Sequence, residues 1–231
     1  MLLDDLGKRE PPDFLAREQL VPILTNGGFE AGLTGWTVVN QAGGSGNWFS
    51  QSGTGSPLNH FAVPAPPEGI AAAMTDQGGP GSHVLYQDFV VPTGVTSANL
   101  SFMQLVASQA AFSNPGSLDY LVNPNQHARV DIMTSVSQPF STAVADVLLN
   151  LQIHVANTAG YENAAFDLTA LLQAHEGETL RLRFAEVDNQ LFFNNGIDNV
   201  NLDVTAPEPA SMLLFGLGAL GIARRSFRQR V

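Results

Sequence analysis

The sequence predicts an all-β domain in which two antiparallel sheets pack face to face. Several short segments alternate apolar and polar residues, as strands with one buried face do. Turn-forming residues separate these segments at short intervals, with 22 glycines and 14 prolines in 231 residues. Lys and Glu, which favour helices, are scarce. The length suits one β domain at residues 21–205 between two tails, residues 1–20 and 206–231.

The N-terminal segment, residues 1–20, does not have the pattern of a secretory signal. Such a signal has a basic start and a continuous apolar core, whereas Asp4 and Asp5 stand near the start here. We therefore expect a non-globular segment. Two explanations stay open: a misassigned start with a signal encoded upstream, or a genuine short linker on a protein that is not exported.

The first strands lie in a part of the chain rich in small residues. A strand is predicted at residues 36–39, Trp-Thr-Val-Val, because Gly-containing turns precede it. The next stretch, residues 41–69, is long for a plain loop. We therefore expect short strands within it, at residues 47–51 and 61–63, and a strand of small residues at 70–76.

The middle of the chain shows clearer alternation. Residues 83–91 alternate along their whole length, and residues 98–107 and 128–134 repeat the pattern. Residues 146–156 are strand-like in their second half. These four segments predict strands of the sandwich.

One short helix is expected after these strands, in residues 166–175. Leu168, Leu171 and Leu172 have helical spacing there, and Asp167 is a candidate N-cap. The pattern is long enough for one or two turns.

The last two strands close the domain. In residues 178–187, Leu180, Leu182 and Phe184 alternate with polar residues, which makes this the clearest strand of the chain. Residues 196–204 form the final strand. Antiparallel strands with turns at such intervals are typical of two packed sheets.

The opening turn resembles a known family. Asn-Gly-Gly-Phe-Glu at residues 26–30, followed closely by Gly35-Trp36, is similar to the start of galactose-binding-like β-sandwiches. This jelly-roll group includes carbohydrate-binding modules. The resemblance implies an antiparallel jelly-roll β-sandwich. Trp36 stands beside the opening turn, and we expect it in the core because most aromatic residues of a sandwich are packing residues.

The same resemblance implies a structural calcium site. In this group, the acid after the opening turn and the acid of a terminal Ile-Asp-Asn-Val strand, here residues 197–200, often lie together at a Ca²⁺. The matching residues are Glu30 and Asp198. Such an ion, with oxygen ligands, would tie the two ends of the domain together. The alternative is that Glu30 is a solvated turn residue and Asp198 caps a hairpin.

A sugar site needs aromatic platforms beside amides and acids. The candidate aromatic residues are Trp48, Phe49, Tyr86, Tyr120 and Tyr161. Most aromatic residues of a sandwich are packing residues, and no spacing brings these five together. The ligand-binding residues therefore stay unknown at this level.

The composition disfavours or excludes several function classes. The net charge is −11, and residues 21–206 contain three arginines and no lysine, so the domain should repel nucleic acid. The absence of cysteine excludes disulfides, thiol catalysis and cysteine zinc sites. The five histidines lack metal-protease spacing, and no Gly-x-Ser-x-Gly motif occurs. No catalytic residues are predicted, and we expect a non-catalytic protein.

The C-terminal tail predicts a short hydrophobic helix. Residues 210–223 carry no charge and would form about 21 Å of helix, against about 30 Å for a bilayer core. Pro209 suits the first helical turn. Arg224, Arg225 and Arg228 would hold the far end on the cytoplasmic side of the inner membrane. The alternative is a buried C-terminal helix of the domain.

The tail resembles the PEP-CTERM sorting signal of Gram-negative bacteria. Pro207-Glu208-Pro209, the apolar helix and the terminal arginines stand in the order of that signal. The resemblance implies recognition by an exosortase, anchoring in the membrane during sorting, and a final place at the cell surface or in the extracellular matrix.

These observations predict an exported, non-catalytic surface or matrix protein whose β-sandwich is an interaction module. The alternative is a carbohydrate-binding module that recognises exopolysaccharide. A weaker alternative is a polysaccharide-active enzyme.

Overall fold

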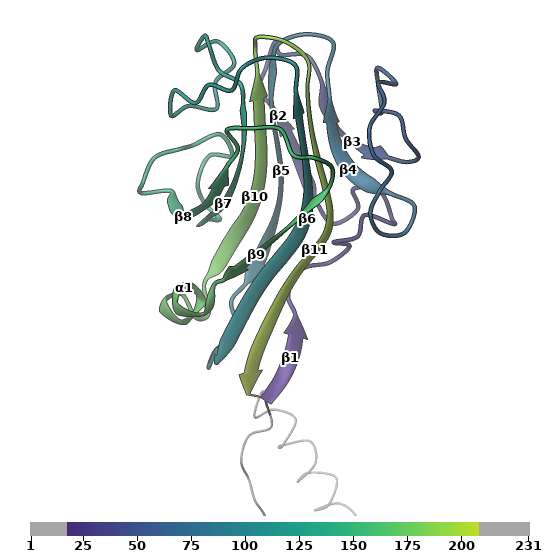
Figure 1. The fold of residues 1–231 in the computed structure, drawn as a ribbon. Helices are drawn as coiled ribbons and strands as arrows, with labels where there is room; N and C mark the ends of the chain where they lie inside the picture. Colours follow the sequence, from purple (N-terminus) through teal and green to yellow (C-terminus); the bar gives the residue numbers. More distant parts are fainter. Residues whose placement is uncertain (1–17, 208–231) are drawn as a thin grey trace, which may run out of the picture.

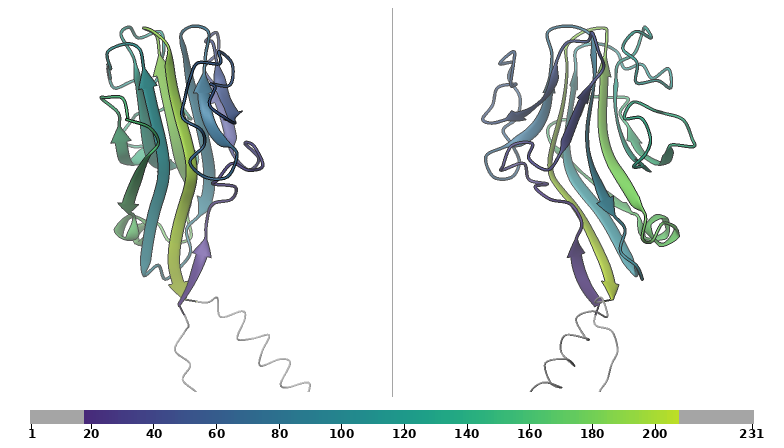
Figure 2. Two further views of the ribbon diagram at one scale, coloured as in Figure 1. Left: turned by 45° about the vertical axis from the view of Figure 1, so that its right-hand side comes forward. Right: turned by 180° about the vertical axis from the view of Figure 1, so that it is seen from behind.

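The computed structural model describes residues 18–207, which form two antiparallel sheets packed face to face (Figures 1 and 2). One sheet comprises, in spatial order, β3 (Asn47–Gln51), β4 (Ala72–Asp76), β11 (Phe193–Pro207), β6 (Ser97–Ser108) and β9 (Glu162–Asp167), with β1 (Glu18–Pro22) also paired to β11. The other comprises β2 (Thr37–Asn40), β5 (Gly81–Val90), β10 (Thr179–Asp188), β7 (His127–Thr134) and β8 (Val147–Ile153). The predicted all-β, antiparallel jelly-roll sandwich is confirmed.

The core lies between the sheets and follows the alternation of the strands. Leu180, Leu182 and Phe184 of β10 enter the main apolar cluster. The ring of Phe184 lies 5.9 Å from that of Trp36 and 5.2 Å from that of Phe102, which comes from the opposite sheet. This aromatic contact joins the two sheets, and Trp36 is a core residue as predicted.

The outer face of the five-stranded sheet is also buried, and charged residues cover part of it beside an apolar cluster of Val84, Leu118, Ala185 and Val187. Arg129 and Arg183 both pair with Asp131 of β7, and Arg181 pairs with Asp88. Backbone carbonyls of the loop after β7 accept hydrogen bonds from Arg181 and Arg183. These are the three arginines that the composition gives as the only Lys or Arg residues of the domain. They form a structural network that holds this loop on the sheet.

Several predicted elements match the structure and others differ. The strand at residues 47–51 is β3. Residues 61–63 do not form a strand, because Ala62 makes only an isolated bridge to Gly55 and the ring of Phe61 is exposed. The edge strand β9 was not predicted.

The predicted helix is present but shorter than its segment. It is α1 (Thr169–Ala174), and the two residues before Leu168 belong to β9. The carboxylate of Asp167 accepts a hydrogen bond from the N–H of Thr169 at 2.8 Å, although Leu168 occupies the N-cap position.

The sheet extends past the limits 21–205 at both ends. β1 begins at Glu18, which is aligned with Pro207, the last residue of β11. Both ends of the described chain therefore lie side by side at one end of the sandwich (Figure 1).

Within residues 18–207, no helix is long and apolar enough to cross a bilayer. The predicted helix at 210–223 lies outside the described residues. The same holds for Glu208, Pro209 and the flanking Arg224, Arg225 and Arg228.

Candidate functional site

The predicted acid Glu30 follows a tight opening turn. Asn26 and Phe29 adopt positive φ angles there, and the Asn26 side chain bonds to the backbone of Ala31, Gly32 and Thr34. The Glu30 carboxylate, held by this turn, accepts hydrogen bonds from two consecutive backbone N–H groups, at residues 70 and 71, at 2.9 and 3.1 Å. Glu30 is exposed, and its carboxylate is attached to the loop that precedes β4.

The second predicted acid, Asp198, lies in β11 where the pairing with β6 is interrupted. Its carboxylate is buried and accepts hydrogen bonds from the N–H groups of Asn199 at 2.7 Å and Glu68 at 3.2 Å. Burial, with the nearby carboxylates of Glu68 and Glu30, raises the pKa of Asp198 to about 6.

The structure thus brings both predicted acids to one region and adds Glu68, which the sequence analysis did not find. The N–H of Val200 donates to the carbonyl of Gly27 at 2.9 Å, so the opening turn and the last strand are joined directly. The carboxylates of Glu68 and Glu30 both act on the pKa of Asp198, so both lie within electrostatic range of it.

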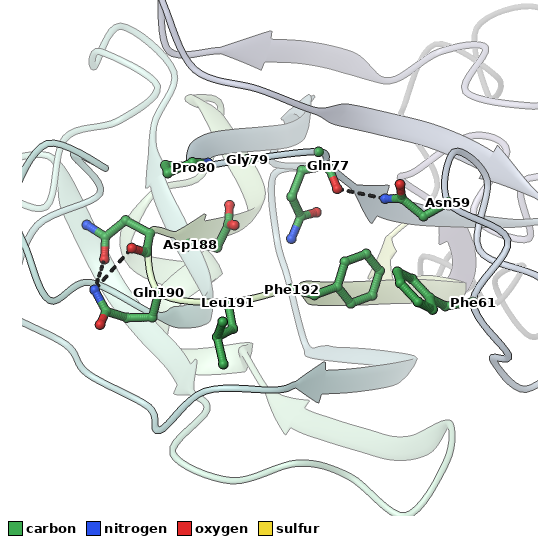
Figure 3. Close-up of a pocket in the computed structure, with 11 residues that line it drawn as sticks. Asn59, Phe61, Gln77, Gly79, Pro80, Asp188, Gln190, Leu191 and Phe192 are labelled. Carbon is green, nitrogen blue, oxygen red and sulfur yellow. Dashed lines mark hydrogen bonds between the residues drawn. The ribbon is translucent and has the colours of Figure 1, made fainter.

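A second candidate site is a pocket of about 290 Å³ at the opposite end of the sandwich from β1, hereafter the loop-end pocket (Figures 1 and 3). Three loops form it: the loop between β3 and β4, the loop from β4 to β5, and the loop from β10 to β11. Its lining residues are Asn59, Phe61, Gln77, Gly78, Gly79, Pro80, Asp188, Asn189, Gln190, Leu191 and Phe192.

The rim of the loop-end pocket is aromatic. Phe61 is 48% exposed, and its ring meets that of Phe192 edge to face at 4.4 Å. Amide side chains lie beside this pair (Figure 3). The Asn59 amide nitrogen donates to Asp76 and to the Gln77 carbonyl, while the Gln77 side-chain oxygen is buried without a partner in the part of the chain that the structure describes.

The floor of the pocket is acidic. Asp188 lines it, and Glu186 and His83 lie behind Asp188 in the sandwich interior. One potential ligand atom from each of the three residues lies within 4.8 Å of the others, so this group could hold a metal ion. Burial raises the pKa of Asp188 to about 7 and that of Glu186 well above its ordinary value, and it lowers the pKa of His83 to about 4.

The structure does not bring the five candidate aromatic residues together. None of them lines the loop-end pocket. Trp48 is buried in the core, Tyr86 lies under the Arg181 guanidinium at 3.8 Å, and Tyr161 packs on the outer face of the six-stranded sheet with Val63, Met74 and Leu105. The aromatic residues that line the pocket are Phe61 and Phe192. The sequence feature that could have indicated them is an aromatic residue within a loop rich in Gly or Asn.

Comparison with known families identifies the tail. Residues 205–229 match the family model described as the PEP-CTERM protein-sorting motif, so the predicted sorting signal is confirmed. The motif indicates an exported protein that an exosortase processes. Its first residues lie within β11, which ends at Pro207.

Comparison with solved structures returns β-sandwiches at low identity. TmCBM61 in complex with β-1,4-galactotriose is 14% identical with a TM-score of 0.45, over 79% of this chain and 97% of that chain. The K3 adhesin domain of Lys-gingipain from Porphyromonas gingivalis is 13% identical with a TM-score of 0.48, over the same shares. A cyclase from Fischerella sp. is 16% identical with a TM-score of 0.47, over 82% and 98%. No curated protein matches the chain.

Proposed function

We propose that this exported protein is a non-catalytic, glycan-binding β-sandwich of the cell surface or extracellular matrix of a Gram-negative bacterium. Its partner is exopolysaccharide, and its binding site is the loop-end pocket. The observation that carries the proposal is the combination, in one pocket, of the exposed ring of Phe61, paired with Phe192, and amide side chains.

Sugar rings match such a lining. The C–H face of a pyranose packs on an aromatic ring, while its hydroxyl groups require donors and acceptors in fixed positions. Phe61 supplies exposed apolar surface, and the exposed amide side chains of Asn59 and Gln190 supply donors and acceptors for hydroxyl groups. A volume of about 290 Å³ lies near the lower end of the range for small-ligand pockets. It suits the end or a short stretch of a glycan rather than a long segment.

The charge of the domain narrows the class of glycan. Residues 21–206 contain fifteen acidic residues against three arginines, and those arginines pair with acids on the outer face. Asp188 also places a carboxyl group in the pocket floor. An anionic polysaccharide would be repelled at long range. We therefore propose a neutral sugar as the ligand.

The loop-end pocket lies far from the C-terminal tail, so a protein attached to a membrane through that tail would keep the pocket accessible to a ligand. Phe192 lines the pocket and directly precedes β11, whose 15 residues end at Pro207 of the sorting motif. At about 3.3 Å per residue, this strand separates the two sites by roughly 50 Å. A protein held in the inner membrane by the helix at 210–223 would direct the pocket away from the bilayer.

The lining also favours binding over hydrolysis. Glycosidases place two carboxyl groups on either side of the scissile bond, whereas Asp188 is the one acidic residue among those that line the pocket. The weaker proposal of a polysaccharide-active enzyme predicts turnover by the purified protein, abolished by Asp188→Asn. Such turnover would overturn the non-catalytic assignment.

The test is a glycan array followed by calorimetry with neutral exopolysaccharide fragments. Phe61→Ala should weaken binding about tenfold, because it removes the exposed ring. Val144→Ala, a change at a residue that is 95% exposed on a different loop, is the matched control and should bind as the native protein does. Equal affinity of the two variants, or no binding to any neutral glycan, would refute the proposal.

A further inference from the structure

Three chemically active side chains meet inside the sandwich, below the loop-end pocket. His83 comes from β5, and Glu186 and Asp188 come from β10. The register aligns Glu186 with His83 and Asp188 with Gly81, so adjacent strands place all three side chains on one face. Their potential ligand atoms lie within 4.8 Å of one another.

These side chains are buried, and four of their polar atoms lack hydrogen-bond partners in the described domain. His83, Glu186 and Asp188 are 1%, 0% and 3% exposed. Within residues 18–207, no partner is present for His83 Nε2, for either carboxylate oxygen of Glu186, or for Asp188 Oδ1. A buried carboxylate without a partner is costly, and two adjacent carboxylates add their mutual repulsion.

Within residues 18–207, no cationic side chain neutralises these two acids. The arginines of the described domain are Arg129, Arg181 and Arg183, and all of them pair with other acids on the outer face of the sheet. The single lysine of the chain, Lys8, lies outside the described residues. The remaining means of neutralising the pair are a shared proton and a bound cation.

The surroundings of His83 favour the cation. Its Nδ1 lies 2.9 Å from the side-chain oxygen of Asn40, which fixes the ring and leaves Nε2 as the free nitrogen. Metal-binding histidines are held in this way by a second hydrogen bond. Gly81 keeps the space beside Nε2 open, because a Cβ at that position would lie 2.6 Å from this atom.

We propose that His83, Glu186 and Asp188 bind one divalent transition-metal cation, with Zn²⁺ as the preferred ion. One imidazole and two carboxylates give a neutral site with a dication. Zn²⁺ accepts nitrogen and oxygen ligands together, whereas Ca²⁺ prefers oxygen alone. Three protein ligands leave a fourth position for water. Asp188 lines the loop-end pocket, which therefore offers an entry path (Figure 3).

The test uses the full chain, carrying no histidine tag and stripped of metal by a chelator. Titration calorimetry should show one Zn²⁺ per protein. Co²⁺ should give visible absorption bands typical of a low-coordinate site with a nitrogen ligand.

Two variants test the ligands. Glu186→Gln, which removes a buried charge and keeps the side-chain volume, should weaken Zn²⁺ binding at least a hundredfold without unfolding the protein. His83→Gln should abolish the Co²⁺ spectrum.

The matched control is Asp203→Asn, which changes an acid of the same domain that lies outside this cluster and outside the group of Glu30, Glu68 and Asp198. It should bind Zn²⁺ as the native protein does. No binding of Zn²⁺ or Co²⁺ to the folded native chain would overturn the proposal and would leave a proton shared by the two carboxyl groups. Equal Zn²⁺ affinity in Glu186→Gln and the native protein would also overturn it. No glycan is used, so the result is independent of the proposed sugar binding.

Discussion

Arg183 and Asp131 form an ion pair on the outer face of the five-stranded sheet in which neither side chain is exposed. Arg129 bonds to the same carboxylate, and the carbonyls of Pro139 and Ser141 accept hydrogen bonds from Arg183 at 2.6 and 2.7 Å. The pair therefore does more than neutralise two charges. It fixes the loop after β7 over the sheet and buries a face that would otherwise be solvated.

Replacing Asp131 should destabilise the protein strongly. Asp131→Ala leaves Arg183 buried without its counter-charge, and we expect a loss of about 3–5 kcal/mol in the free energy of unfolding. Urea denaturation measures it. Asp88→Ala is the control, because the Asp88 side chain is 36% exposed and Arg181 keeps its bonds to the carbonyls of Ser135 and Ser137. A loss of about 1 kcal/mol is expected there. Equal losses would contradict a special role for the buried pair.

Stability should fall in mild acid because of His127. Burial, followed by the charge of Arg129, lowers the pKa of His127 from 6.5 to about 4. Between these values the unfolded chain binds a proton and the folded protein does not. The contribution of neutral His127 to the free energy of unfolding is therefore complete above about pH 6.5, and it is lost as the pH falls towards 4. The loss is on the order of 3 kcal/mol when complete.

The check is the free energy of unfolding measured from pH 7.5 to pH 4.5. His127→Gln should have a shallower decline than the native protein. The difference between the two proteins at pH 7.5 gives the packing cost of the substitution alone. Parallel curves would show that His127 titrates alike in the folded and unfolded states.

Calcium is proposed to bind at Glu30, Glu68 and Asp198, and its removal should lower the melting temperature. The ion would offset the repulsion among the three carboxylates and would tie the opening turn to β11. Calorimetric melts with Ca²⁺ and with EDTA measure the effect. Asp198→Ala should abolish the difference, whereas Asp203→Ala, on the same strand, should keep it. Identical native melts in the two conditions would count against the site.

The sorting motif predicts processing close to the end of β11. Intact mass of the native protein, taken from envelope and secreted fractions of its host, should show a chain that ends near residues 207–211. Since Pro207 is the last residue of β11, such a product keeps the whole described sandwich. A mass that still includes Arg224 and Arg225 would instead make the tail a membrane anchor.

Strands with a clear alternation or with turn signals beside them were predictable, and these include the edge strands β2, β3 and β8. The edge strand β9 was not predictable. In β10, every second residue contacts the core, so its pattern is visible locally. The edge strand β9 is mostly exposed and places only Ala164 and Phe166 against the core. Such a short pattern is indistinguishable from a loop in the sequence. Residues 61–63 gave the reverse error, because Phe61 serves the pocket rim instead of a sheet face.

The sequence by itself determined the fold class, most of the strands, the absence of cysteine chemistry and the sorting motif, because these depend on composition and on local order. It also placed Glu30 and Asp198 together through a family resemblance. Only the tertiary structure decided that Glu68 joins them, that Phe61 meets Phe192, and that His83 faces Glu186 and Asp188. The physical reason is that these side-chain contacts depend on the paths of loops and on the register between strands far apart in the chain. No local sequence pattern specifies either of them.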